Sequence, residues 1–143
     1  MGGNINVIHK KQITGMRGVF LVAAEMSNQG LIVTTTSRSA FGADILVTDD
    51  RCRCAFSIQV KTNSKSQSFW LLNKKSRKLA SPSHVYVFVN LSRNDGPHEF
   101  YVVPSRIVSK NMYVERRPRS TWYSFEKKCA VKYRDKWKLF YSK

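Results

Sequence analysis

The sequence predicts a single α/β domain in which helices flank a central β-sheet. Its 143 residues are enough to bury one hydrophobic core without disulfides or metals as staples. Short runs of β-branched and aromatic residues separated by turn residues are typical of strands, and one longer apolar segment near the N-terminus has the length of a helix. There is no repeat and no low-complexity boundary, so residues 1–143 are expected to form one domain.

The first expected element is a helix over residues 14–29, preceded by a loose, basic N-terminus that extends through Lys11. Apolar residues surround this segment almost completely, and Gly30 follows it where a glycine commonly ends a helix. A helix that is apolar on most sides is buried, so we expect it to pack against the sheet. Glu25 is its only acidic residue and lies on the rim of the apolar stripe, where it is solvated or salt-bridged. The alternative is that Glu25 helps to hold a metal ion.

Short segments rich in β-branched or aromatic residues and bounded by turn residues are expected to form the strands. The segment at 85–91 is continuously apolar, which is typical of a strand that is buried on both faces. The run that follows it, beyond a turn of Asn, Asp, Gly and Pro, is expected to be its hairpin partner. The expected strands are residues 31–36, 45–47, 55–61, 69–72, 85–91 and 100–103.

The C-terminal part is expected to begin with a short helix at 105–108, with Ser105 as its cap. Residues 113–119 are basic and contain a proline, so we expect a loop there. Residues 123–133 are expected to be partly helical. Trp137 is expected to anchor a final segment on the core, and stacking on a nucleic-acid base is the alternative for this residue.

The chain is organised around the neighbouring strands at 45–47 and 55–61. Side chains alternate between the faces of a strand, so each of these strands has one apolar and one polar face. An even-numbered hairpin loop places Asp44 directly opposite Gln59, whereas an odd-numbered loop would turn Asp44 to the apolar face and bury its carboxylate. The pattern therefore selects the even register. Asp44, Gln59 and Lys61 are expected to converge on one patch of the sheet.

A carboxylate, an amide and a lysine in this arrangement suit metal-assisted attack on a phosphate. Mg²⁺ prefers oxygen ligands and is commonly held by one or two carboxylates together with substrate phosphate. Such an ion can activate water and shield the charge on the phosphate. A lysine two residues beyond the second ligand can orient the attacking water and stabilise the developing charge. The alternative is an ordinary hairpin with a polar outer face.

The spacing resembles the PD-(D/E)XK nuclease superfamily, with Asp44 at the aspartate position and Gln59-Val60-Lys61 as the (D/E)XK tripeptide. It is most similar to small bacterial members that read, loosely, Gly-x-Asp-Ile-Leu-Val followed by Ile-Gln-Val-Lys-Thr. The resemblance implies a restriction-endonuclease-like fold with a mixed central sheet, and a DNA endonuclease that often acts as a homodimer. It also implies Mg²⁺ or Mn²⁺ as cofactor, Asp44 and Gln59 as metal ligands, and Asp44, Gln59 and Lys61 as catalytic residues.

Two positions depart from the pattern of that superfamily. Gln59 replaces the usual acid of the tripeptide, a variant that also occurs among its members. Relatives often carry a glutamate just after the glycine of the first helix, and here Val19 follows Gly18. Both departures lower the negative charge that is available to a metal ion.

The net charge of +16 indicates a polyanionic partner, which means nucleic acid or an anionic membrane surface. No segment resembles a signal peptide or a membrane span, so we expect a cytoplasmic protein that does not bind a membrane. The expected polyanionic partner is therefore DNA. No Asp or Glu occurs between residues 51 and 94, and the cations of this stretch follow directly on Lys61. This favours phosphate contacts over a merely solvated face. The residues expected to contact nucleic acid are Lys65, Trp70, Lys74, Lys75, Arg77 and Lys78.

Other kinds of site have less support in the sequence. An odd number of cysteines indicates a reducing compartment, and Cys52 and Cys54 lack a second pair at zinc-ligand spacing. The histidines form no metal-ligand pattern and are expected in loops or at the surface. Three function classes remain open: a Mg²⁺-dependent endonuclease, a nucleic-acid-binding module on the same fold with a weakened metal site, and a scaffold for an acidic protein partner.

Overall fold

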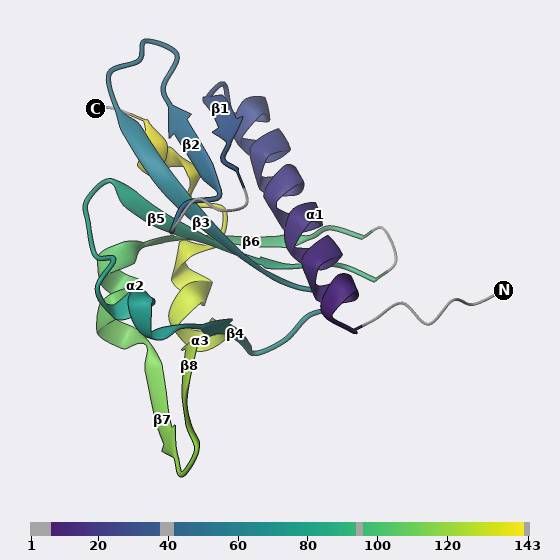
Figure 1. Ribbon diagram of the computed structural model, residues 1–143. Coiled ribbons are helices and arrows are strands. Elements are labelled where there is room, and N and C mark those ends of the chain that lie inside the picture. The colour runs from purple at the N-terminus through teal and green to yellow at the C-terminus, as the bar shows by residue number, and fades with distance from the viewer. Residues whose placement is uncertain (1–6, 38–41, 94–95, 142–143) are drawn as a thin grey trace, which may run out of the picture.

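The computed structural model describes residues 7–37, 42–93 and 96–141 and is shown in Figure 1. Its α-helices are α1 (Val7–Asn28), α2 (Ser105–Asn111) and α3 (Lys127–Ala130). Short 3-10 helices follow as η1 (Lys74–Arg77), η2 (Val131–Tyr133) and η3 (Trp137–Phe140). The strands are β1 (Ile32–Thr35), β2 (Ile45–Thr48), β3 (Ala55–Asn63), β4 (Phe69–Leu72), β5 (His84–Asn90), β6 (Glu99–Pro104), β7 (Tyr113–Arg117) and β8 (Ser120–Glu126).

Five of the strands form a mixed sheet in the order β1-β2-β3-β5-β6. Strands β3 and β5 run parallel, and the other neighbours run antiparallel, including the expected hairpin of β5 and β6. A second, antiparallel sheet has the order β4-β8-β7. The mixed central sheet with flanking helices confirms the expected fold class. The second sheet is an addition that the sequence did not predict.

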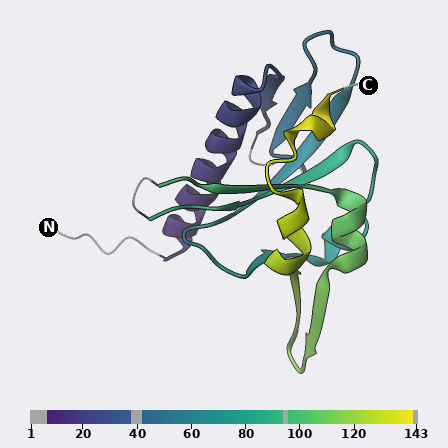
Figure 2. The ribbon, with the colours of Figure 1, turned by 180° about the vertical axis from the view of Figure 1, so that it is seen from behind.

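Different elements cover the two faces of the five-stranded sheet, as the opposite views of Figure 1 and Figure 2 show. On one face, α1 and η3 contribute to a core cluster that contains Val22 and Met26 of α1 and Ile58 of β3. On the other face, the second sheet, α2 and α3 contribute to a cluster that contains Trp70 and Phe88. Side chains of β5 alternate between the two faces of the sheet, and both faces are covered. Strand β5 is therefore buried along its whole length.

Helix α1 begins earlier than expected, at Val7, so the loose N-terminus predicted through Lys11 is wrong for residues 7–11. Its first turns contain good helix formers such as Lys10 and Gln12 and no helix breaker, which allows the helix to continue beyond the core that it covers. The predicted end is confirmed: Gly30 has a φ of +85°, a left-handed conformation that glycine adopts without strain.

The loop predicted at residues 113–119 is wrong, because β7 and β8 form a hairpin that projects from the body of the molecule (Figure 1). The proline that suggested a loop, Pro118, lies between the two strands, where no ladder hydrogen bond is required of it. The segment at 123–133 is helical only after Glu126, in α3 and η2.

Three expectations about single residues can also be compared with the structure. Ser105 does not cap α2, because its Oγ donates to the carbonyl of Ser81 at 2.8 Å and tethers the loop before β5 instead. His84 is 7 % exposed in the core strand β5, so the loop or surface position expected for it is wrong. Trp137 is 5 % exposed and packs with Phe100 in the core, as expected of an anchor.

Candidate functional site

The backbone of Asp44 is held between two neighbouring strands, immediately before β2. The register that pairs Ile45 with Ile58 places Asp44 opposite Gln59, which confirms the even register predicted from the alternation. The amide of Asp44 donates to the carbonyl of Ile58 at 2.7 Å, and the amide of Thr36 donates to the carbonyl of Asp44 at 2.9 Å. Asp44 is therefore fixed by hydrogen bonds on both sides, although β2 begins one residue later.

The carboxylate of Asp44 faces the Gln59 side chain at close range. Its Oδ2 accepts two hydrogen bonds of 2.8 Å, one from Gln59 Nε2 and one from the backbone amide of Val60. Strand β3 extends past the start of β2, so the Val60 amide takes this carboxylate as its partner in place of a strand. Within the described ranges, Oδ1 of Asp44 and Oε1 of Gln59 make no hydrogen bond, so both oxygens are available to a ligand.

A depression of about 480 Å³, the acid pocket, lies between this pair and the middle of α1. Helix α1 contributes one polar side chain to it, the exposed Gln12, which the expected helix start had placed outside the helix. The helix otherwise presents apolar or small residues to the pocket. The residues that line the acid pocket are Gln12, Gly15, Met16, Val19, Phe20, Thr35, Thr36, Ser37, Asp44, Gln59 and Val60.

Glu25 is not part of this pocket. Its Oε1 accepts a hydrogen bond of 2.9 Å from Gln29 Nε2, one helical turn further along α1. Among the described residues, those that α1 contributes to the pocket lie between Gln12 and Phe20, so the pocket lends no support to the alternative in which Glu25 assists a metal ion at Asp44.

Lys61 lies on the same face of β3 as Gln59 but opens into a different depression. In the register of the five-stranded sheet, Lys61 pairs with Phe88 of β5, and Trp70 of the second sheet packs against Phe88 with ring centroids 5.0 Å apart and planes inclined at 40°. Burial beside these rings lowers the pKa of Lys61, and the negative charge of Asp44 partly opposes that shift by raising it. The ammonium is therefore partly desolvated yet electrostatically coupled to the candidate ligand.

The depression beside Lys61, which we call the lysine groove, has a volume of about 670 Å³. It lies between the N-terminal half of α1, the end of β3 and the second sheet, and it combines lysine side chains with an apolar floor. Strand β3 connects it to the acid pocket, because Gln59 and Val60 line one and Lys61 lines the other. The residues that line it are Lys10, Lys11, Ile13, Thr14, Lys61, Thr62, Asn63, Ser64, Gln67, Phe69, Trp70, Leu71 and Trp122.

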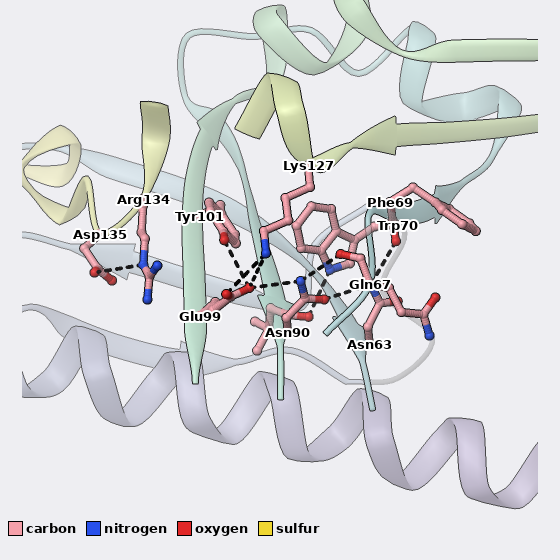
Figure 3. A network of polar contacts seen from close by, with 11 residues as sticks. Asn63, Gln67, Phe69, Trp70, Asn90, Glu99, Tyr101, Lys127, Arg134 and Asp135 are labelled. Atoms are coloured by element: carbon pink, nitrogen blue, oxygen red, sulfur yellow. Dashed lines mark hydrogen bonds and ion pairs between the residues drawn. The ribbon is translucent and has the colours of Figure 1, made fainter. Parts of the chain in front are cut away.

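A network of polar contacts holds the floor of the lysine groove in place (Figure 3). Asn63 Nδ2 donates to the carbonyl of Phe69 at 2.8 Å and to Asn90 Oδ1 at 3.0 Å, which ties the end of β3 to β4 and β5. Asn90 Nδ2 in turn donates to Glu99 Oε2 at 3.1 Å, and Lys127 pairs with the same carboxylate. The network thus links both sheets at the point where the groove opens.

Trp70 cannot stack on a nucleic-acid base, so that part of the expected binding set is wrong. Its side chain is 1 % exposed, and its Nε1 donates to the carbonyl of Val89 at 2.9 Å. Phe69 and Trp122 of the second sheet also line the groove, and sequence reasoning missed Trp122 because its strand was not predicted. The alternation of apolar and polar residues after the turn at Pro118 is the only sequence signal that could have identified Trp122.

The cations of the expected binding set are all exposed, but they lie in two places. Lys65 follows β3 in the loop to β4, where it lines a depression other than the lysine groove. The others are on η1 and the residue after it, and η1 packs beside α2, where Ser109 Oγ donates to the carbonyl of Arg77. The exposed cations of this second surface are Lys74, Lys75, Arg77 and Lys78.

The donor set around Asp44 suits a weakly held, hard cation. In the part of the chain that the structure describes, no group of three His, Cys, Asp or Glu side chains is arranged to bind a metal ion. One carboxylate oxygen and one amide oxygen are available at Asp44 and Gln59, and Mg²⁺ commonly takes its remaining ligands from water and substrate phosphate. The residues present therefore fit Mg²⁺ or Mn²⁺ that binds together with a phosphate, and they do not fit a closed, all-protein site. Of the described helices, none combines the length and apolar composition needed to cross a membrane.

No protein-family model and no curated protein matches the sequence. Among solved structures, the chain is similar to the bacterial homing endonuclease I-Ssp6803I, with 16 % identity, a TM-score of 0.59, and coverage of 97 % of this chain and 91 % of that one. It is also similar to Hjc, a Holliday junction resolvase from the archaeal hyperthermophile Archaeoglobus fulgidus, with 12 % identity and a TM-score of 0.51. That match covers 82 % of this chain and 87 % of the resolvase. At these identities the likeness shows the fold, which is that of restriction-endonuclease-like nucleases.

Proposed function

We propose that this protein is a metal-dependent endonuclease that hydrolyses phosphodiester bonds of DNA. The observation that carries the proposal is the geometry at the start of β2, where Gln59 hydrogen-bonds to Asp44 and Lys61 is coupled to the same carboxylate. A fold shared with a homing endonuclease and a junction resolvase supports it, as does the net charge of +16.

Each of the three residues has a distinct role in this proposal. Asp44 and Gln59 would hold the cation through their side-chain oxygens, and the bound cation would supply an activated water and shield charge on the phosphate. Lys61 orients the attacking water and stabilises the charge that develops on the phosphate, an interaction strengthened by its partial desolvation. The Val60 amide keeps Asp44 Oδ2 occupied, so that the carboxylate presents its other oxygen to the pocket.

The test is cleavage of supercoiled plasmid DNA with Mg²⁺, with Mn²⁺ and with EDTA. The wild type should nick or linearise the plasmid with either cation and leave it intact with EDTA. Asp44→Asn should abolish cleavage while preserving the fold, because the asparagine oxygen still accepts the two hydrogen bonds made to Oδ2. Lys61→Ala should abolish cleavage and cost little DNA affinity, since many other cations remain.

Lys136→Ala is the matched control, because Lys136 is exposed and lines neither the acid pocket nor the lysine groove. It should cut at the wild-type rate. Cleavage that persists equally in the Asp44 and Lys61 variants would remove these residues from the mechanism.

A second candidate, a nucleic-acid-binding module without catalysis, is favoured by one observation. Among its described lining residues, the acid pocket contains a single carboxylate, and α1 contributes apolar side chains and Gln12 in place of an acid. This candidate predicts DNA binding in EDTA and no cleavage with either cation.

Cleavage of both strands at one site would further require two copies of the protein, and light scattering of the DNA complex measures whether a homodimer forms.

A further inference from the structure

The outward face of the second sheet carries large apolar side chains that no other element covers completely. The register pairs Leu71 and Tyr113 with the same residue of β8 and places Trp122 two positions away, so these side chains share one face. Leu71 is 48 % and Tyr113 is 50 % exposed, whereas Trp70 and Phe125 point the other way into the core. We call this surface the aromatic face; it consists of Phe69, Leu71, Tyr113 and Trp122.

The aromatic face is continuous with the lysine groove. Phe69 and Trp122 line the groove on one side and a second depression, of about 570 Å³, on the other. Their ring centroids are 6.5 Å apart with planes inclined at 59°, so the two rings do not stack on each other. The guanidinium of Arg117 lies 4.8 Å from the centroid of the Trp122 ring, where it adds a cation beside the aromatic surface.

The charges around these rings favour a polyanion. Lysines 10, 11 and 61 line the groove, and none of its lining residues in the described part of the chain is acidic. Two acids share the outward face, but both are already in ion pairs: Glu115 with Arg117 at 2.9 Å and Glu126 with Lys128 at 3.2 Å. Flat apolar rings beside a row of lysines are complementary to nucleobases linked by phosphates.

We propose that the aromatic face and the lysine groove together bind an unpaired DNA strand and lead it towards Lys61. Bases stack on Trp122 and Phe69, and phosphates lie against Lys10 and Lys11. The bases of an intact duplex are stacked on one another inside the helix and cannot reach these rings, so the surface distinguishes unpaired from paired DNA. The inference rests on the proposed nuclease function for what happens at Lys61 and adds to it the form of the substrate.

The test combines variants of the protein with variants of the DNA probe. Binding is measured by fluorescence anisotropy in EDTA, so that no cleavage is required. The probes are a single strand of about 20 nucleotides, the same strand with abasic sites in place of its central bases, and a blunt duplex. Trp122→Ala should weaken binding of the intact strand between about fivefold and a hundredfold, the range expected for one stacked base. Binding of the abasic strand and of the duplex should change less than twofold.

Two further variants keep the test interpretable. Trp122→Phe retains an aromatic ring and the fold, so it should keep most of the affinity for the intact strand. Tyr141→Ala removes an aromatic residue that is 40 % exposed but lines neither depression, and it should bind all three probes as the wild type does. Intrinsic tryptophan fluorescence gives a direct readout, because Trp70 and Trp137 are buried and quenching by the strand should disappear in Trp122→Phe.

The inference would be overturned if the wild type bound the intact and abasic strands equally, because the groove would then recognise charge alone. An equal loss of affinity for all probes in Trp122→Ala would also overturn it. The two proposals fail separately: plasmid cleavage without base-dependent binding leaves the nuclease and removes the stacking surface. Base-dependent binding without cleavage in either metal leaves the stacking surface and removes the nuclease function.

Discussion

The amide side chain of Gln59 donates a hydrogen bond to the carboxylate of Asp44. An acidic residue at the same position would instead repel that carboxylate. The same contact uses the amide nitrogen, which leaves the amide oxygen of Gln59 for a cation. An amide oxygen is a weaker ligand than a carboxylate because it carries no net charge. The residue therefore stabilises the folded chain without metal at the expense of metal affinity.

Gln59→Glu should lower the stability of the fold without metal and raise its affinity for metal. Without metal, the second carboxylate faces Asp44 at hydrogen-bond distance, so one carboxyl pKa should rise and the fold should lose roughly 1–2 kcal/mol. Mn²⁺ should restore the lost stability, because it binds the folded pair and not the unfolded chain. The measurement is thermal unfolding of wild type and variant, each with EDTA and with millimolar Mn²⁺. Equal metal-induced shifts in both proteins would mean that Asp44 and Gln59 do not form an ion site.

His84 provides a second prediction at the scale of a residue. Its Nδ1 lies 2.8 Å from Ser57 Oγ, and its Nε2 is buried without a hydrogen-bond partner in the described part of the chain. Burial lowers the pKa of His84, and a hydrogen bond with Ser57 partly opposes the shift. Between the lowered folded pKa and the ordinary value of 6.5, the unfolded chain binds a proton that the folded chain does not.

The free energy of unfolding should therefore fall as the pH drops below 6.5, by up to about 1.4 kcal/mol for each pH unit in that window. Urea unfolding at a series of pH values measures this dependence. His84→Gln should remove this part of it, because glutamine does not titrate. His9→Gln, which changes an exposed histidine on α1, should retain it. A profile that is the same in all three proteins would assign the acid sensitivity to other groups.

At the scale of elements, the approach of α1 to the sheet depends on Gly18. A Cβ added at this position would lie 1.7 Å from Thr62 Oγ1 on β3, closer than two non-bonded heavy atoms can come. Val22 and Met26, further along the same helix, are fully buried in the core cluster that includes β3 residues. The glycine thus lets the helix backbone lie close to the strand that carries Gln59 and Lys61.

Gly18→Ala should destabilise the protein by about 1–3 kcal/mol, because the cost of overpacking exceeds the better helix propensity of alanine. Gly15→Ala is the matched control on the same helix: no atom lies within 4 Å of its added Cβ. It should stabilise the protein by up to about 1 kcal/mol. Chemical denaturation measures both values, and a stabilised Gly18→Ala would show that the helix and strand can separate at no cost.

At the scale of the whole molecule, the excess of cations predicts salt-dependent binding. Each phosphate contact to a single strand contributes about −0.7 to the slope of the logarithm of affinity against the logarithm of salt concentration. Replacing both Lys10 and Lys11 by glutamine should therefore make the slope shallower by about 1.4. The same double change at Lys136 and Lys138, which alters net charge equally outside the groove, should leave the slope unchanged. Equal effects of both pairs would indicate attraction by net charge alone.

The sequence by itself determined that Asp44 lies opposite Gln59. Alternation has a period of two residues, and only one register of β2 and β3 buries Ile45 while keeping the Asp44 carboxylate out of the core. The core strand β5 and its hairpin partner β6 were equally predictable, because their apolar runs are bounded by strong turn residues. These are local patterns, and local patterns suffice when neighbouring segments pair with each other.

Only the tertiary structure decided which aromatic residues are buried and how much water Lys61 retains. Trp70 and Leu71 are adjacent in β4, and the pattern does not say which of them faces the five-stranded sheet. That choice arises when β4 pairs with β8, a strand that follows it by about fifty residues, and packs over Phe88. The same packing desolvates Lys61 and leaves Trp122 at the groove, because burial depends on contacts between segments that are distant in the chain.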